Sequence, residues 1–183
     1  MNSTKVNDIV ARSYTSSTNA LGTQFNIETN TADQRYPKIK YDASSTTATV
    51  VYEDDRNKAA AGVDIYARRV TTSGTVNAAF AVASSTNDEY APQLALRSGL
   101  LKEVTYYRIP VNVDYNFDVY GQSLNRGALS GAAFAVANGS SIREMTPAIS
   151  CASTTSCVDV YRWFNSGDPT TDVDRIKARV LSY

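Results

Sequence analysis

The chain has 183 residues, 43% of them hydrophobic, and its 18 Lys and Arg side chains balance 18 Asp and Glu. This length suits one domain with a sizeable core, and the scattered charges give no basic patch for nucleic acid or an anionic membrane. The apolar runs are far shorter than the roughly 20 residues that span a bilayer. Histidine is absent, which excludes Ser-His-Asp and Cys-His catalysis and every His-ligated metal site. We therefore expect no nucleic-acid partner, no membrane span and no metal or other cofactor.

Four markers recur along the chain in a fixed order. The first is an aspartate that opens the phrases "DIVARSY", "DIYARRV", "DVYGQSL" and "DRIKARV", at intervals of 56, 54 and 56 residues. A phenylalanine, a proline and an aromatic, β-branched segment follow in each unit. Such a pattern predicts tandem repeats of roughly 55 residues. The markers are Asp8, Asp64, Asp118 and Asp174; Phe25, Phe80 and Phe134; Pro37, Pro92 and Pro147; and the segments 47–54, 103–109 and 157–164.

Each unit contains four short segments that are typical of β-strands. Alternating β-branched and aromatic residues fit a half-buried pleated strand, and Gly- and Asn-containing turns separate the segments. The alanine-rich segments 77–85 and 131–139 have helical propensity. However, they align with 23–30 ("TQFNIETN"), a poor helix former, which favours a strand in all three. We predict an all-β chain with less than about a tenth of helix.

Four strands per unit, repeated in tandem, predict β-propeller blades. We expect one all-β domain over residues 1–183, with repeats at 8–63, 64–117 and 118–173 and a closing strand at 174–183. Pro37, Pro92 and Pro147 would open the innermost strand of each blade, where no ladder donor is needed. The phenylalanines would anchor the outermost strands. The residues two positions after each proline would point into the packing between blades: Ile39, Leu94 and Ile149.

The motif order P-x-I-x-Y, V-V-Y-x-D-x-R, D-I-Y-x-R resembles a repeat of secreted bacterial β-propeller proteins. The first unit carries it best, in "YPKIKYDASSTTATVVYEDDRN" followed by "DIYARRV". The resemblance covers nearly the whole chain and implies the propeller fold and an exported protein. It implies no activity, because these repeats are largely uncharacterised. The start "MNSTKVNDIV" has no signal-peptide pattern, so we expect a secreted or periplasmic protein whose signal peptide is not in this chain.

Two cysteines, Cys151 and Cys157, are separated by five residues. Two thiols cannot form a closed four-ligand zinc site, and the spacing is too wide for a C-x-x-C redox pair. A short polar loop between two strands can bring them to bonding distance across a hairpin. We predict a disulfide, with two free or buried thiols as the alternative.

The densest charge lies in "YEDDRN", at Glu53, Asp54, Asp55 and Arg56. Paired carboxylates serve glycoside hydrolysis or bind calcium, but they also cap strand ends and pair with arginine. The sequence alignment places Arg108 and Ile109 at the Glu53–Asp54 position of the second unit, and Arg162 and Trp163 in the third, so the acidic pair is not shared. Aromatic side chains bind sugars, although they more often pack between strands. Our candidate binding residues are Asp54, Asp55, Arg56, Tyr107 and Trp163.

The recurring aspartates are predicted to be structural. A buried or edge aspartate can accept backbone N–H groups in the turn before its strand, and each repeat needs that turn. We therefore assign Asp8, Asp64, Asp118 and Asp174 to the fold, together with the recurring Phe and Pro residues.

The leading functional expectation is a non-enzymatic, exported module that recognises a glycan or a protein surface with the variable loops of one face. The alternatives are a structural fragment of a longer exported propeller and, ranked lower, a carboxylate-dependent propeller glycosidase. A glycosidase needs two carboxylates near the central axis. The predicted innermost strands offer no acid, since they carry Lys38, Lys40, Gln93, Ala95, Ala148 and Ser150.

The strand count predicts an assembly. The thirteen expected strands begin with the third strand of one blade and end with the third strand of another. Propellers have roughly four to eight blades. A two-fold dimer, in which each N-terminal outer strand completes the last blade of the other copy, would give six blades and remove the open sheet edges. The alternative is a piece of a longer single-chain propeller.

Overall fold

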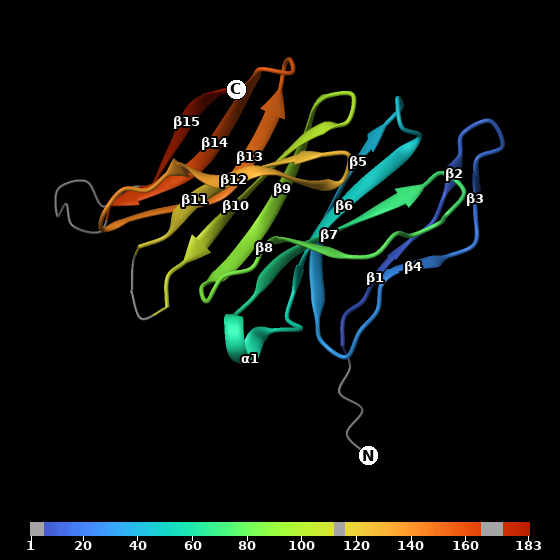
Figure 1. The fold of residues 1–183 in the computed structure, drawn as a ribbon, viewed down its shortest axis with the longest axis horizontal. Coiled ribbons are helices and arrows are strands. Elements are labelled where there is room, and N and C mark those ends of the chain that lie inside the picture. The colour runs from blue at the N-terminus through green and yellow to red at the C-terminus, as the bar shows by residue number, and fades with distance from the viewer. Residues whose placement is uncertain (1–5, 112–115, 166–173) are drawn as a thin grey trace.

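The computed structural model describes residues 6–111, 116–165 and 174–183, and Figure 1 shows the fold. These residues form fifteen strands and one four-residue helix, α1 (Lys58–Ala61), so the all-β prediction is confirmed. No helix in the described ranges is long or apolar enough to cross a membrane. The strands are β1 Ile9–Ala11, β2 Tyr14–Thr15, β3 Ala20–Leu21, β4 Phe25–Glu28, β5 Gln34–Asp42, β6 Thr47–Asp54, β7 Asp64–Thr71, β8 Phe80–Ala83, β9 Asp88–Ser98, β10 Leu101–Ile109, β11 Asp118–Asn125, β12 Ala128–Ala137, β13 Ile142–Cys151, β14 Ser156–Asn165 and β15 Arg175–Ser182.

The strands form consecutive antiparallel sheets in chain order. Two sheets have four strands, β5-β6-β7-β8 and β9-β10-β11-β12, and the last has three, β13-β14-β15. The strands β1 and β4 pair as the third and fourth strands of an incomplete first sheet. Figure 1 shows the sheets arrayed side by side from the N-terminal pair to the C-terminal sheet. The propeller-like fold is therefore confirmed, and the small β2–β3 hairpin accounts for the two strands that the sequence did not predict.

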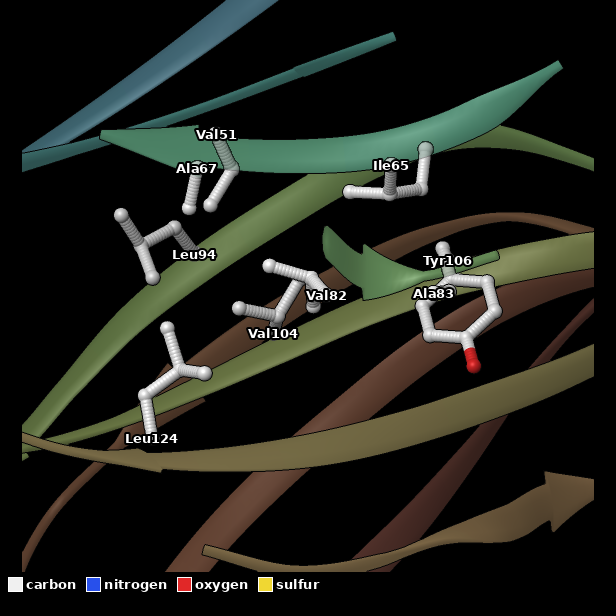
Figure 2. Packing of buried hydrophobic residues seen from close by; sticks show 9 residues of the cluster. All are labelled: Val51, Ile65, Ala67, Val82, Ala83, Leu94, Val104, Tyr106 and Leu124. Carbon is white, nitrogen blue, oxygen red and sulfur yellow. The ribbon is translucent and has the colours of Figure 1, made fainter. Parts of the chain in front are cut away.

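Three apolar clusters hold the sheets together, one at each interface between neighbours. Ile9 and Ile27 pack against Val50, Tyr52 and Val70 of the β5–β8 sheet. The opposite face of that sheet meets the β9–β12 sheet in the cluster of Figure 2. Val119, Val136 and Ala137 then meet the β13–β15 sheet. Each sheet thus buries a face against its neighbour, as blades of a propeller do. The Figure 2 cluster comprises Val51, Ile65, Ala67, Val82, Ala83, Leu94, Val104, Tyr106 and Leu124.

The recurring prolines lie inside the innermost strands β5, β9 and β13, not at their first residues as we expected. Each ladder shifts register at the proline, so every innermost strand has a bulge there. The residue before the proline has a left-handed backbone in all three sheets: Tyr36 (φ 54°), Ala91 (φ 51°) and Thr146 (φ 49°). A proline is tolerated within a sheet at a bulge because no ladder donor is required there. The repeat therefore specifies a bulge.

The phenylalanine marker packs into a different interface in each sheet. Phe25 contacts the first cluster, Phe80 the second and Phe134 the third. In the β9–β12 sheet the Phe134 ring lies over Gly121, where a Cβ would clash with the ring. Gly121 replaces the alanine of the sheet before it and makes room for this ring.

The aspartate markers stand at the start of the third strands but differ in environment. Asp64 and Asp118 are buried first residues of β7 and β11. Asp64 accepts a hydrogen bond from Asn57 Nδ2 at 2.9 Å, a side-chain donor. Asp8 and Asp174 lie just before β1 and β15 and are exposed. Asp174 precedes the ladder because Arg175 occupies the register position of Asp64, and its carboxylate pairs with Arg162 at 2.7 Å.

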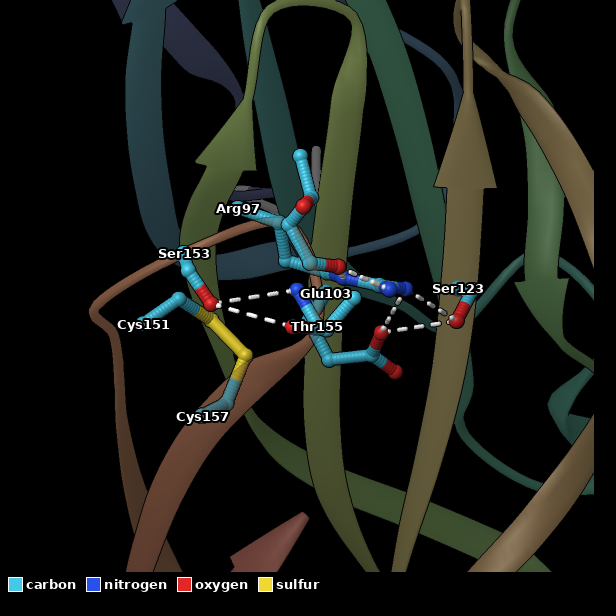
Figure 3. Close-up of a disulfide and its surroundings, with 8 residues drawn as sticks. Arg97, Glu103, Ser123, Cys151, Ser153, Thr155 and Cys157 are labelled. Carbon is cyan, nitrogen blue, oxygen red and sulfur yellow. Dashed lines mark hydrogen bonds and ion pairs between the residues drawn. A yellow bond between two sulfur atoms is a disulfide. The ribbon is translucent and has the colours of Figure 1, made fainter. Parts of the chain in front are cut away.

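The predicted disulfide between Cys151 and Cys157 is confirmed. The two residues are ladder partners at the end of the β13–β14 hairpin. Figure 3 shows the bond beside Arg97 and Glu103 of the neighbouring sheet, and Arg97 donates to the carbonyl of Thr154 in the intervening loop. The bond thus braces a hairpin that the neighbouring sheet also holds, and it fits an oxidising compartment.

Candidate active site

The three bulges converge on a cavity of about 410 Å³. The left-handed residues Tyr36, Ala91 and Thr146, one from each innermost strand, all line it. Inner strands surround the axis of a propeller, so this cavity lies on the side of the sheets that faces such an axis. Its other lining residues are Arg35, Lys38, Glu53, Tyr90, Gln93 and Tyr107.

Glu53 is the carboxylate among the described residues that line the cavity. It lies near the end of β6 and is 2% exposed. Its Oε1 accepts the N–H of Ala91 at 2.8 Å, and its Oε2 is buried without a hydrogen-bond partner. Arg35 Nε lies 3.8 Å from that oxygen. Burial raises the pKa of Glu53 above its ordinary value, although the Ala91 bond and the Arg35 charge oppose this shift. A carboxyl with a raised pKa is suited to donate a proton.

Arg35 is held beside Glu53 by other acids. Its Nη2 and Nη1 bond the two Asp55 carboxylate oxygens at 2.8 and 3.1 Å. Asp33 adds a contact of 3.4 Å. This two-point pairing fixes the plane of the guanidinium and turns its Nε edge toward Glu53. A fixed cation at the cavity wall can orient a polar or anionic ligand group.

Two tyrosines form an aromatic wall of the cavity. The rings of Tyr90 and Tyr107 lie 5.6 Å apart, and Phe117 continues the stack at 6.2 Å from Tyr107. Burial, with the charge of Asp88, raises the pKa of Tyr90 to about 12. Burial and the negative charge of Glu53 also raise the pKa of Tyr107. Both hydroxyls are therefore neutral donors at ordinary pH, on an apolar surface of the kind on which sugar rings stack.

The other candidate binding residues lie away from this cavity. Asp54 alternates to the opposite face of β6, is fully buried, and pairs with Arg56 Nη2 at 2.6 Å. Arg56 also reaches Glu28 at 2.8 Å and lies over the Tyr66 ring at 4.1 Å. Trp163 packs into the third apolar cluster with Lys177 Nζ 3.8 Å above its ring. Of the five, Tyr107 lines the cavity, and Asp55 reaches it through Arg35.

The register of the sheets revises the sequence alignment by one residue in the second unit. Across β5–β6, Glu53 pairs with Arg35, the residue before the left-handed Tyr36. Across β9–β10, Tyr107 pairs with Tyr90, the residue before the left-handed Ala91. Tyr107 is therefore the counterpart of Glu53. The sequence analysis named Glu53 within the YEDDRN cluster but left it out of the candidate binding residues. It sought the acids of a glycosidase on the innermost strands, whereas this acid reaches the cavity from the second strand. The recurring residue-before-proline position, which forms the bulge in three strands, is the sequence signal that could have located the site.

No group of three or more His, Cys, Asp or Glu side chains within the described ranges is arranged to hold a metal ion. The cavity therefore offers one carboxyl, one fixed guanidinium, one lysine and an aromatic wall. These groups can bind a polar ring and exchange a proton with it.

No protein-family model matches the sequence, and no curated protein sequence matches it. Solved structures do match. An α-L-arabinanase of Penicillium chrysogenum bound to arabinobiose superposes with a TM-score of 0.55 and 10% identity, over 82% of this chain and 47% of that one. An α-L-arabinofuranosidase of Lactobacillus brevis superposes with a TM-score of 0.51 and 15% identity, over 87% of this chain and 56% of that one. An α-L-arabinofuranosidase of Fusarium graminearum with an iminosugar inhibitor has a TM-score of 0.50 and 11% identity, over 87% of this chain and 64% of that one.

This chain thus spans about half to two thirds of the length of these proteins. The similarities support the propeller fold, while the specific repeat motif finds no family match. They overturn our leading expectation of a non-enzymatic binding module, because the structures that share the fold are glycoside hydrolases, the class that we ranked lower.

Proposed function

We propose that this protein is a β-propeller glycoside hydrolase whose active site is the central cavity and whose proton-transferring carboxyl is Glu53. The observation that carries the proposal is the Glu53 side chain itself: a buried carboxyl at the convergence of three inner strands, with one oxygen free of hydrogen bonds. The glycosidase structures of the same fold favour this chemistry over other uses of such a carboxyl.

In this proposal Glu53 acts as the general acid. Glycoside hydrolysis begins when a carboxylic acid protonates the oxygen of the leaving group, while a second carboxylate attacks the sugar or activates water. Burial raises the pKa of Glu53 above its ordinary value, which favours the protonated form that a general acid needs. The Ala91 N–H fixes Oε1 at 2.8 Å, and Oε2 has no hydrogen-bond partner of its own.

Tyr90 and Tyr107 would hold a sugar ring by stacking, and Arg35 and Lys38 would bond its hydroxyls from the other side. The first substrate class to test is arabinose-containing glycosides, since the similar structures are arabinanases and arabinofuranosidases. We further propose an exported protein, in line with the disulfide, and a ring that a second copy of the chain completes.

The test is hydrolysis of aryl α-L-arabinofuranosides, linear arabinan and a panel of other aryl glycosides. The Glu53→Gln variant keeps an acceptor for the Ala91 N–H and loses the acid. We expect about 10²- to 10⁴-fold lower kcat/KM, the usual contribution of a general acid. The matched control is Glu144→Gln, another buried glutamate with a raised pKa that lies outside the cavity lining, which should keep full activity. Full activity of the Glu53→Gln variant, or no hydrolysis of any glycoside by the purified protein, would overturn the proposal.

A further inference from the structure

The outer face of the β13–β15 sheet is apolar and uncovered. Ile176, Val180 and Val158 are 75%, 65% and 43% exposed, and they point to the same side because strand residues alternate. The other face of this sheet is already packed, since Tyr161, Trp163 and Leu181 lie in the third cluster. An exposed apolar face of this kind marks an interaction surface.

The equivalent faces of the two preceding sheets are buried. The ladders β14–β15 and β6–β7 have the same register. Ile176 and Ala178 on β15 are therefore the equivalents of Ile65 and Ala67 on β7, and Val160 is the equivalent of Val51. Ile65, Ala67 and Val51 are each fully buried against the following sheet. The chain therefore makes this interface twice and presents the same face a third time, uncovered. The surface that fits it is the facing side of another sheet of this repeat.

The other end of the chain presents that facing side. Ile39 and Tyr41 on β5 are 60% and 49% exposed, whereas Leu94, the equivalent of Ile39 on β9, is 5% exposed. The difference arises because the sheet before β5 has only its outer strands β1 and β4, which cover Val50 and Val70 but not the inner strand. A groove of about 240 Å³ lies between β1 and β5, lined in part by Ile9, Pro37 and Ile39.

We infer that a second copy of this chain fills this groove, its β13–β15 sheet packing on β5–β8 of the first copy and taking β4 as its fourth strand. Each copy then supplies two complete sheets and shares two composite ones, so a two-fold dimer closes a ring of six. Closure also pairs the open edge of β15, which is otherwise a template for aggregation.

The strands β1 and β15 are alternatives for one place in the composite sheet. Ala11 on β1 stands opposite Phe25, just as Ala67 on β7 stands opposite Phe80. The strand β1 is therefore the third strand of its sheet, as β7 and β15 are of theirs. Since β15 has eight ladder partners on β14 and β1 has three on β4, β15 of the second copy displaces β1.

The strand β4 stays in place during this exchange because Glu28 anchors it. The buried Glu28 carboxylate accepts bonds from Arg68 at 2.9 Å and from the Tyr52 hydroxyl at 2.8 Å, both on the sheet that β4 packs against. It also accepts a bond at 2.8 Å from Arg56, which follows β6. Hydrogen bonds to an ionised carboxylate are the stronger kind. The anchor is independent of β1.

The inference rests on the proposed function in one respect: a closed ring would supply the second carboxylate that glycoside hydrolysis needs. The two-fold axis of such a dimer coincides with the ring axis, so the second copy brings its own Glu53 to the far side of the central depression. A single copy walls the cavity on one side, with an inner strand from each of three sheets. The dimer is therefore the catalytic unit.

The first test measures mass in solution by light scattering. We expect twice 19.9 kDa for the native chain. A double variant, Ile176→Asp with Val180→Asp, should give a folded monomer, because both side chains are exposed in one copy. Leu129→Asp, at an equally apolar position that is 50% exposed on β12, is the control and should stay dimeric. A native chain that is monomeric at all practical concentrations, or an Ile176→Asp, Val180→Asp double variant that remains dimeric, would overturn the inference.

A second test uses cross-linking. Leu94 lies in one cluster with Ala67 and Val51, and Figure 2 shows these side chains together. By equivalence, Ile39 of one copy should contact Ala178 of the other. A variant with Ile39→Cys and Ala178→Cys should form a covalent dimer on mild oxidation, and Leu129→Cys with Ala178→Cys should not. The reverse pattern would refute the interface. Neither test uses activity, so loss of the glycosidase proposal would leave this result standing.

Discussion

The Glu53 carboxylate of one sheet accepts the backbone N–H of Ala91 in the next sheet at 2.8 Å. The bond joins the proposed acid to the bulge that shapes the cavity, because Ala91 is the left-handed residue before Pro92. One side chain thus serves both the interface between two sheets and the site at their centre. The two roles can be separated by substitution.

Replacing Glu53 by Ala should destabilise the fold more than replacing it by Gln. The alanine leaves the Ala91 N–H without an acceptor, which costs about 1–3 kcal/mol for a buried donor, whereas glutamine keeps a carbonyl oxygen at that place. Chemical denaturation of both variants measures the difference. Equal stability of the two would mean that the Ala91 bond contributes nothing to the fold.

Tyr107→Ala should raise KM for a glycoside by about tenfold, since losing a stacking face costs roughly 1 kcal/mol or more. Tyr107→Phe should leave KM nearly unchanged because the ring remains. Tyr14→Ala, which removes a tyrosine that is 60% exposed on β2, serves as the control. Steady-state kinetics decide the matter, and an equal effect of the alanine and phenylalanine variants would argue against stacking.

Stability should depend on pH through Asp159, a fully buried carboxyl on β14. Burial, with the nearby charge of Glu103, raises the pKa of Asp159 to about 7. Glu103 itself pairs with Arg97 at 3.6 Å. The unfolded carboxyl ionises near pH 4 and the folded one near pH 7, so this group makes the protein progressively less stable between these values as pH rises.

Asp159→Asn should remove that part of the pH dependence. The free energy of unfolding of the variant, relative to the native chain, should rise by a few kcal/mol between pH 4 and pH 8. Urea titrations at a fixed protein concentration give this difference directly. A difference that stays constant with pH would show that Asp159 titrates normally in the folded protein.

Replacing both Cys151 and Cys157 by Ser should lower the free energy of unfolding by about 2 kcal/mol, because the bond closes a loop of only a few residues and removes little entropy from the unfolded chain. Thermal unfolding with and without reductant offers an independent check. If reductant leaves the midpoint of the native chain unchanged while the cysteines are reduced, the disulfide does not contribute to stability.

Much of the fold could be predicted from the sequence because neighbouring sheets pack on one another in the same way at successive interfaces. Because of that constraint, a phenylalanine recurs in the outer strands (Phe80 and Phe134) and a proline in the inner ones. These recurring residues allow the strand order to be predicted. The site was harder to predict. Glu53 reaches the cavity because a bulge in the neighbouring sheet turns the Ala91 N–H toward it, and an alignment of one unit with another carries no information on such a contact.

Two further differences between the predicted and the observed fold arise from the neighbouring strands. Asp174 matches the other aspartates in sequence but falls one residue short of the ladder position, which Arg175 takes. The exposure of Ile39, where Leu94 is buried, follows from the missing inner strands of the first sheet rather than from any property of its own segment. Both are set by neighbours outside the local sequence.

The most direct test of the central claim is a crystal structure of the Glu53→Gln variant with an arabino-oligosaccharide. We predict that a glycosidic oxygen lies within hydrogen-bond reach, about 2.6–3.2 Å, of the residue 53 side chain, with a sugar ring against Tyr90 and Tyr107. A sugar bound elsewhere on the molecule, with the central cavity empty, would contradict the account.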